Sequence, residues 1–150
     1  MLKVIRTSSD DPDFILLVKQ LDADLAETDG EDSVFYSQFN KIDKIKHAVV
    51  ALENNIPIGC GAMKEFMSDS MEIKRMYTAP EGRGKGIATA VLTELESWAA
   101  ELSYKKCVLE TGKRQPEAIN LYKKKGYKNI PNYGQYIGIE NSVCFEKDLN

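Results

Sequence analysis

A short, basic, glycine-containing segment constrains this chain more than any other feature. Residues 83–86 read Arg-Gly-Lys-Gly and stand between an alternating stretch, 71–78, and an amphipathic stretch, 87–102. Alternation predicts a strand, and spacing near 3.6 residues predicts a helix. Glycines remove side chains where a backbone must approach a ligand closely, and the first amides of a helix have no partner within it. The segment therefore predicts an anion site at a helix N-terminus.

The ligand that this segment favours is a phosphate or pyrophosphate, and Arg83 and Lys85 add positive charge to it. The nucleotide-binding pattern G-x-x-x-x-G-K-S/T is absent. The dinucleotide pattern G-x-G-x-x-G fails because Thr89 stands in place of its third glycine. A dinucleotide loop would also follow the first strand, whereas this loop follows the fourth predicted strand. The residues alone leave one alternative open, a basic glycine turn that only caps a helix.

The rest of the chain alternates between predicted strands and helices. Strands are predicted at 2–5, 48–52, 56–66, 71–78, 105–110, 127–130 and 142–149. Helices are predicted from a polar start at 8–12 to a break at Asp29-Gly30, and at 34–42, 87–102 and 116–125. This order predicts a mixed sheet flanked by helices. Within 71–78, alternation places Met71, Ile73 and Tyr77 on one face and Glu72, Lys74, Met76 and Thr78 on the other.

The composition narrows the class of protein. A chain of 150 residues fits a single domain over 1–150. The net charge of −3 argues against a nucleic-acid partner, because nucleic-acid-binding domains are usually basic. No apolar run approaches the roughly 20 residues that span a bilayer, and no signal-peptide stretch is evident, so we expect no membrane partner and a cytoplasmic location. Three dispersed cysteines and the single His47 predict no metal site.

Two motifs carry a resemblance to a known family. The segment 76–88 looks like motif A of the GNAT family of N-acetyltransferases, whose pattern R/Q-x-x-G-x-G/A is matched by Arg83, Gly86 and Ala88. A second family pattern, A-I-x-L-Y-x-x-x-G-F/Y, is matched by Ala118, Ile119, Leu121, Tyr122, Gly126 and Tyr127. The runs 59–62, 110–112, 133–136 and 142–147 are similar to a bacterial subgroup of small-molecule acetyltransferases, a likeness that names no acceptor.

The resemblance implies a fold and a cosubstrate. The implied α/β (α+β) fold has a mixed, mostly antiparallel sheet of about seven strands and about four flanking helices, with a V-shaped splay between the fourth and fifth strands. The implied cosubstrate is acetyl-CoA. Its pantetheine arm would pair with the backbone of Met76, Tyr77 and Thr78. Its pyrophosphate would be held by the amides of Arg83, Gly84, Lys85, Gly86, Ile87 and Ala88.

The resemblance also implies a reaction. The acetyl group would pass directly to the primary amine of a small-molecule or amino-acid-like acceptor, and Tyr122 would protonate the leaving thiolate. Glu72 and Glu110, on the strands expected to splay, are the candidates for the base; the alternative for each is a solvated or salt-bridged carboxylate. Lys74, on the same face as Glu72, weakens Glu72 as a base. Many family members carry Asn where this chain has Gln115, and Asn120 is a substitute for that cofactor contact.

Other interpretations remain beside this one. The same loop fits a non-catalytic acyl-CoA-binding or sensing module, and a protein or peptide N-acetyltransferase is a third candidate. Lys74 and Arg75 either meet an acidic group on the substrate or are exposed strand charges. Tyr133 and Tyr136 either line the acceptor pocket, cover the edge of the sheet, or form a homodimer contact.

Overall fold

A computed structural model describes residues 1–29 and 44–149. The elements in chain order are β1 (Leu2–Thr7), α1 (Pro12–Asp29), β2 (His47–Glu53), β3 (Ile56–Met67), β4 (Ser70–Thr78), the 3₁₀ turn η2 (Pro80–Gly82), α3 (Ile87–Glu101), β5 (Lys106–Gly112), α4 (Pro116–Lys124), β6 (Lys128–Ile130), the 3₁₀ turn η3 (Gly134–Tyr136) and β7 (Ser142–Asp148). The helix predicted over 34–42 lies outside the described residues. In the described part of the chain, no helix is long and apolar enough to cross a membrane.

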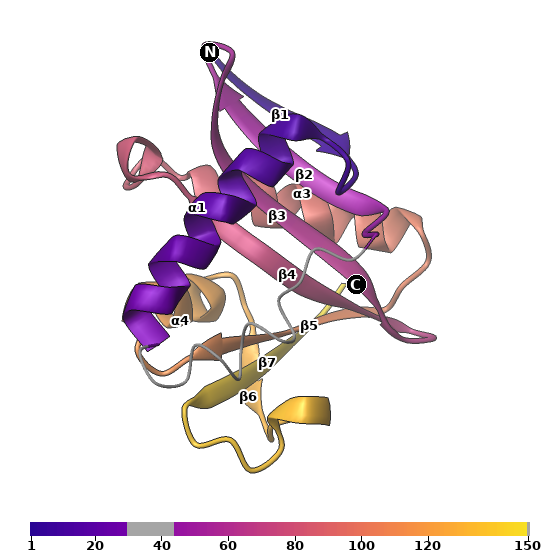
Figure 1. Ribbon diagram of the computed structural model, residues 1–150. Coiled ribbons are helices and arrows are strands. Elements are labelled where there is room, and N and C mark those ends of the chain that lie inside the picture. The colour runs from indigo at the N-terminus through magenta and orange to yellow at the C-terminus, as the bar shows by residue number, and fades with distance from the viewer. Residues whose placement is uncertain (30–43, 150) are drawn as a thin grey trace.

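One seven-stranded sheet organises the chain (Figure 1). The strand order is β1-β2-β3-β4-β5-β7-β6, and every neighbouring pair is antiparallel except β4 and β5, which run parallel. Figure 1 shows α1 crossing one face of the sheet and α3 lying against the opposite face. The predicted mixed, mostly antiparallel sheet is confirmed, and three α-helices flank it within the described residues.

Two apolar layers hold the helices against the sheet. On the α3 side, Leu92, Leu95 and Phe145 are fully buried in one cluster. On the α1 side, Phe14 and Leu17 are fully buried in a second cluster. Burying a side chain of this size contributes about 1.5–3 kcal/mol relative to leaving it exposed. These two layers hold the helices firmly against both faces of the sheet.

The structure confirms the helix start predicted at 8–12, with a polar capping side chain and a proline in the first turn. The Asp11 side chain accepts a hydrogen bond from the backbone N–H of Asp13 at 2.8 Å, and Pro12 occupies the first helical position. A capping carboxylate satisfies an amide that the helix itself leaves unpaired, and proline lacks an N–H to satisfy. α1 therefore begins where the polar run ends.

The parallel pair β4 and β5 separates partway along its length. The two strands pair from Ser70 opposite Lys106 to Ile73 opposite Leu109, and the ladder ends there. β4 nevertheless continues to Thr78 and β5 to Gly112. The predicted V-shaped splay between the fourth and fifth strands is thus confirmed, and it leaves a gap with two unpaired strand edges.

A β-bulge in β4 corrects one prediction about this strand. Lys74 pairs with Ala62 and Tyr77 with Cys60, so that Arg75 and Met76 together oppose the single Gly61. Arg75 has a φ of +60°. An extra residue shifts the two-residue alternation by one. Tyr77 consequently packs in the α1-side cluster instead of beside Met71 and Ile73, and Met76 packs on the α3 side instead of beside Glu72 and Lys74.

Candidate active site

A large cavity of about 690 Å³ opens at the outer part of the gap, where β4, the start of α3 and the start of α4 converge. It brings together nine of the predicted cofactor-binding residues: Met76, Tyr77, Thr78, Arg83, Gly84, Gly86, Ile87, Ala88 and Gln115. The side chains of two others do not line this cavity, although the backbone of Lys85 lies between Gly84 and Gly86, which do. The Lys85 ammonium pairs with the Glu53 carboxylate at 3.2 Å, and Asn120 is exposed on α4 and is not among the residues that line this cavity.

The glycine loop at this end has space in front of its backbone. Gly84 and Gly86 have φ values of +78° and +79°, and a Cβ built at either position would meet no atom of the described chain within 4 Å. Gly86 is the residue before the first turn of α3, and its carbonyl accepts the N–H of Ala90 at 3.0 Å. The left-handed conformation favours glycine, and the amides of the first turn have no partner within the helix.

Arg83 fixes the loop to its surroundings. Its Nε donates to the Thr78 carbonyl at 3.0 Å, and its Nη2 lies 3.4 Å from the Asp24 carboxylate of α1. The side chain is about half exposed, so the ion pair with Asp24 is worth little by itself. The contact to Thr78 holds the loop at the end of β4, where the cavity begins.

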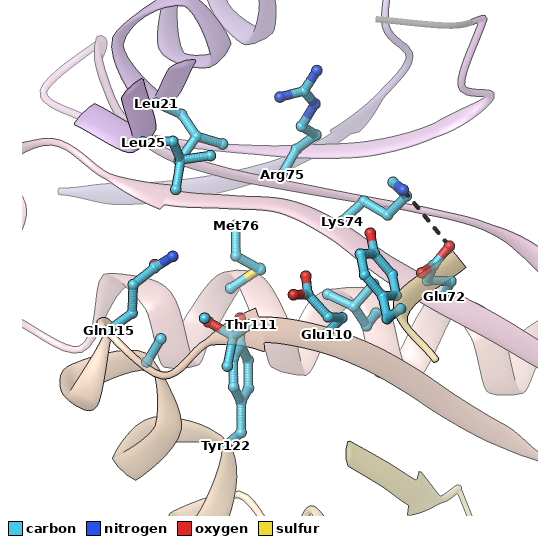
Figure 2. A pocket seen from close by; sticks show the side chains of 14 residues that line it. Leu21, Leu25, Glu72, Lys74, Arg75, Met76, Glu110, Thr111, Gln115 and Tyr122 are labelled. Atoms are coloured by element: carbon cyan, nitrogen blue, oxygen red, sulfur yellow. Dashed lines mark ion pairs between the residues drawn. The ribbon is translucent and has the colours of Figure 1, made fainter. Parts of the chain in front are cut away.

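A smaller cavity of about 110 Å³ lies at the inner part of the gap, where β4 and β5 begin to separate (Figure 2). Figure 2 shows Met76 from β4 and Tyr122 from α4 facing each other across the gap, with Glu110 of β5 beside them. Six residues line both cavities: Leu21, Leu25, Met76, Gln115, Ala118 and Tyr122. The two cavities therefore adjoin at Met76 and Tyr122.

Tyr122 is buried at this junction, at 6% exposure. Its ring lies 5.8 Å from the ring of Tyr127 and 6.3 Å from that of Phe145. Burial raises the pKa of the Tyr122 phenol above its ordinary value, and the nearby Glu110 carboxylate raises it further. Tyr122 is therefore a protonated hydroxyl held between the two cavities, not a surface tyrosine.

The two candidate carboxylates differ in their surroundings. Glu72 is 5% exposed; its Oε2 accepts a hydrogen bond from the Tyr133 hydroxyl at 2.8 Å, and its Oε1 lies 3.7 Å from the Lys74 ammonium. Glu110 is half-buried, lines the smaller cavity, and contributes to the raised pKa of both Tyr122 and Tyr136. Glu72 is thus bonded to Tyr133 and Lys74, and Glu110 lies beside the tyrosine at the junction of the cavities.

The structure excludes one of the two interpretations of Lys74 and Arg75, because neither is an exposed strand charge. The Lys74 side chain is 12% exposed and pairs with Glu72. The Arg75 side chain is 3% exposed, and its Nη1 donates to the Asp22 carboxylate of α1 at 2.7 Å. A charge buried this far needs a partner. Asp22 supplies it from a helix 53 residues earlier in the chain, which the sequence alone does not indicate.

The cysteines and the histidine take no part in either cavity. Cys60, Cys107 and Cys144 are buried, and burial raises the pKa of their thiols to about 12, about 12 and about 11. His47 packs edge-on against Trp98 with ring centroids 4.7 Å apart. Among the described residues no group of three His, Cys, Asp or Glu side chains is arranged to hold a metal ion.

Sequence reasoning missed several residues that line the gap. Leu21 and Leu25 carry the helical spacing of a core stripe, yet they also line both cavities. Thr111 and Gly112 line the smaller cavity because β5 continues beyond its last pair with β4. Tyr136 was weighed as a pocket residue, and the structure brings it to the smaller cavity. The residues of α1 gave no signal, because only the packing of that helix across β4 brings them there.

Comparison with known proteins finds one matching family. The model of the acetyltransferase (GNAT) family matches residues 15–127. An IAA acetyltransferase from Azospirillum brasilense is 32% identical over 102 residues, which cover 67% of each chain. The N-acetyltransferase YsnE of Bacillus subtilis, named as uncharacterised, is 34% identical over 101 residues, which cover 66% of this chain and 67% of that one.

Solved structures agree with this family match in their fold. A protein of Klebsiella pneumoniae described as an acyl-CoA N-acyltransferase superposes with a TM-score of 0.84 at 26% identity, covering 100% of this chain and 99% of the other. An acetyltransferase from Thermoplasma acidophilum in complex with coenzyme A superposes with a TM-score of 0.70 at 18% identity, with 99% of each chain covered. The latter likeness concerns the fold alone.

Proposed function

The chain belongs to the acetyltransferase (GNAT) family and is an acyltransferase, and from this premise we propose that it transfers the acetyl group of acetyl-CoA directly to a primary amine of a small-molecule or amino-acid-like acceptor. The observation that carries the proposal is the meeting of the two cavities at Met76 and Tyr122. A helix N-terminus lies at one end of this path, which suits a phosphate-bearing donor. The Glu110 carboxylate lies at the other end, which suits an acceptor that arrives as a cation.

The donor end has what a pyrophosphate with an amide-bearing arm requires. The open space in front of Gly84 and Gly86 gives a pyrophosphate access to the amides that begin α3. The β4–β5 ladder ends at Ile73, so the edge of β4 at residues 76–78 can pair with the amides of a pantetheine arm. Gln115 lines both cavities, and its amide can contact the same arm. The backbone amide of Lys85 belongs to the same loop, while its side chain pairs with Glu53; Asn120 is exposed on α4.

Tyr122 is proposed as the general acid. In the reaction the amine nitrogen forms a C–N bond to the acetyl carbon, the C–S bond breaks, and the sulfur of CoA leaves as a thiolate. The raised pKa keeps the Tyr122 phenol protonated at neutral pH, so that it can donate its proton to the thiolate. A proton from solvent then restores the phenol.

Glu110 is favoured over Glu72 as the base that takes the proton from the acceptor amine. Glu110 is half-buried beside Tyr122 in the smaller cavity. Glu72 already accepts the Tyr133 hydroxyl and pairs with Lys74. A base has to reach the proton that it removes, directly or through one water. The position of Glu110 beside Tyr122, where the two cavities adjoin, favours it for this role.

The test is release of free CoA thiol from acetyl-CoA with a panel of small amines, amino acids, polyamines and peptides. We expect turnover with at least one small primary amine, and a loss of about 100-fold in kcat for Glu110→Gln with acetyl-CoA binding retained. Tight binding of CoA without turnover of any acceptor would instead identify a binding or sensing module. Turnover confined to peptides would move the acceptor class to proteins.

A further inference from the structure

The segment between β6 and β7, residues 131–141, folds back on itself as a preformed unit. The Asn132 side chain donates to the carbonyls of Tyr136 at 3.1 Å and Ile139 at 3.0 Å, and the N–H of Tyr136 donates to the Tyr133 carbonyl at 2.9 Å. Tyr136 is 3% exposed and lines the smaller cavity. This segment, called the acceptor wall below, is thus one boundary of the space assigned to the acceptor.

One side chain connects the acceptor wall to β4. The Tyr133 hydroxyl donates to Glu72 Oε2 at 2.8 Å, and its ring lies 4.7 Å from the ring of Phe66 and 5.9 Å from that of Tyr136. A hydrogen bond to a carboxylate is stronger than one between neutral groups. Burial raises the pKa of the Tyr133 phenol, and the Glu72 charge raises it further, so the hydroxyl stays a donor.

Glu72 lies where the two halves of the sheet meet, so its hydrogen bond with Tyr133 connects them. Glu72 lies on β4 opposite Val108 of β5, one residue before the last pair of the ladder. The acceptor wall belongs to the other half of the sheet, beyond β5 and β7. The Tyr133–Glu72 bond therefore joins the two halves at the narrow end of the gap, 61 residues apart in the chain.

We propose that Glu72 is a positioning residue that fixes the acceptor wall through Tyr133 and thereby sets how tightly the enzyme binds its acceptor. The proposal rests on the proposed function. It assigns Glu72 a role that does not involve the transferred proton. It also makes Tyr133 and Tyr136 determinants of acceptor selection, while the donor cavity, lined by neither tyrosine nor by Glu72, is left unaffected.

The central experiment compares two Tyr→Phe variants, each of which deletes one tyrosine–glutamate hydrogen bond. Tyr133→Phe removes the bond to Glu72, and Tyr104→Phe removes an exposed bond of 2.6 Å to Glu65 that lies outside both cavities. We expect Tyr133→Phe to raise the acceptor KM about tenfold with the acetyl-CoA KM unchanged. Tyr104→Phe should leave both constants unchanged. Equal acceptor KM values in the two variants would overturn the proposal.

Substitutions of Glu72 separate positioning from proton transfer. The amide oxygen of Glu72→Gln can still accept the Tyr133 hydroxyl, so this variant should keep kcat within about threefold, whereas Glu72→Ala should raise the acceptor KM as Tyr133→Phe does. A loss of about 100-fold in kcat for Glu72→Gln would make Glu72 the base and overturn the proposal. This comparison decides the question even if Tyr133→Phe does not fold.

A readout without turnover keeps this inference distinct from the proposed function. Amide hydrogen exchange of residues 131–141 should be faster in Tyr133→Phe than in the wild type or in Tyr104→Phe, because the wall has lost its anchor. Unchanged exchange in Tyr133→Phe would show that the bond does not hold the wall, whatever the activity. A wild type that binds CoA but transfers nothing would instead refute the proposed function.

Discussion

The two ends of the gap between β4 and β5 are built in different ways. The donor end is formed mainly by backbone: two glycines with positive φ in an exposed loop, the helix terminus that follows them, and the edge of β4 beyond its ladder with β5. The acceptor end is formed by the buried side chains of Glu72 and Tyr136 and the partly buried Tyr133, which meet from distant parts of the chain. A site built from one contiguous segment of backbone can be recognised from a short sequence motif. A site built from distant side chains exists only once the chain has folded.

The largest effect is expected where the two ends meet. Tyr122→Phe removes the proton donor and leaves the ring packed against Tyr127 and Phe145, so kcat should fall about 100-fold or more with little change in the acetyl-CoA KM. Steady-state kinetics with both substrates varied provide the measurement. A kcat within threefold of the wild type would show that another group protonates the thiolate.

The pH dependence of the wild type offers a check on the same residue. Because the pKa of the Tyr122 phenol is raised, its protonated form persists above the ordinary tyrosine value near 10. At saturating substrates kcat should therefore show no alkaline decline between pH 8 and about 10. An alkaline decline within that range would be inconsistent with Tyr122 as the acid.

A matched pair of glycine substitutions should affect the two substrates differently, with changes in KM that are smaller than the loss of kcat expected for Tyr122→Phe. Gly86 in the donor loop and Gly134 in the acceptor wall have φ values of +79° and +53°, and a Cβ at either would meet nothing within 4 Å. Each alanine substitution carries a similar backbone strain of about 1–2 kcal/mol. Gly86→Ala should raise the acetyl-CoA KM about tenfold, and Gly134→Ala should affect only the acceptor KM. If both variants changed the KM of the same substrate, the distinction between a donor end and an acceptor end would be wrong.

The smallest effect concerns the packing behind Tyr122. The Tyr127 hydroxyl donates to the buried Glu96 carboxylate of α3 at 2.8 Å, and Lys147 pairs with the same carboxylate at 2.9 Å. Tyr127→Phe should lower the free energy of unfolding by about 2 kcal/mol, because it removes a buried hydrogen bond to a charged group, and should lower kcat a few-fold. Urea denaturation and kinetics measure the two effects.

An exposed contact of the same helix, α3, serves as the control. Lys125, the residue that follows α4, donates to Thr93 Oγ1 of α3 at 2.8 Å in an exposed position. Thr93→Val should change stability by less than about 0.5 kcal/mol, as surface substitutions usually do. Equal losses in Thr93→Val and Tyr127→Phe would mean that any contact from α3 supports Tyr122 equally.

Features with a local sequence pattern were predictable, whereas features that depend on tertiary packing were not. The sheet, the glycine loop and the splay follow from periodicity, turn chemistry and family resemblance. The bulge in β4 was missed because Arg75, a residue that seldom takes a positive φ, carries it. Without the bulge, alternation puts Tyr77 on the wrong face. The interpretation of Lys74 and Arg75 as exposed strand charges fails because Lys74 pairs with Glu72 and Arg75 pairs with Asp22 of α1 once the chain has folded.

Asn120 is a case that spacing alone could have decided. Ala118 and Tyr122 are four residues apart on α4 and line the same cavities. Side chains three or four positions apart share a helix face, whereas those two positions apart do not. Asn120 is two residues from each, and it is exposed in the structure. Gln115, just before the helix, needed no such argument and lines both cavities.

The short parallel ladder between β4 and β5 joins two antiparallel units of the sheet. On one side β1 to β4 form an antiparallel meander, and on the other β5, β7 and β6 form a second antiparallel unit. Four residue pairs, from Ser70–Lys106 to Ile73–Leu109, are the only strand pairing across this seam in the described sheet. The side chains of Met71, Cys107 and Leu109 at this seam are buried, so the two halves are held together by packing as well as by the ladder. We expect trimming one of them to leave a cavity at the seam and to disturb the spacing of donor and acceptor as well as the stability.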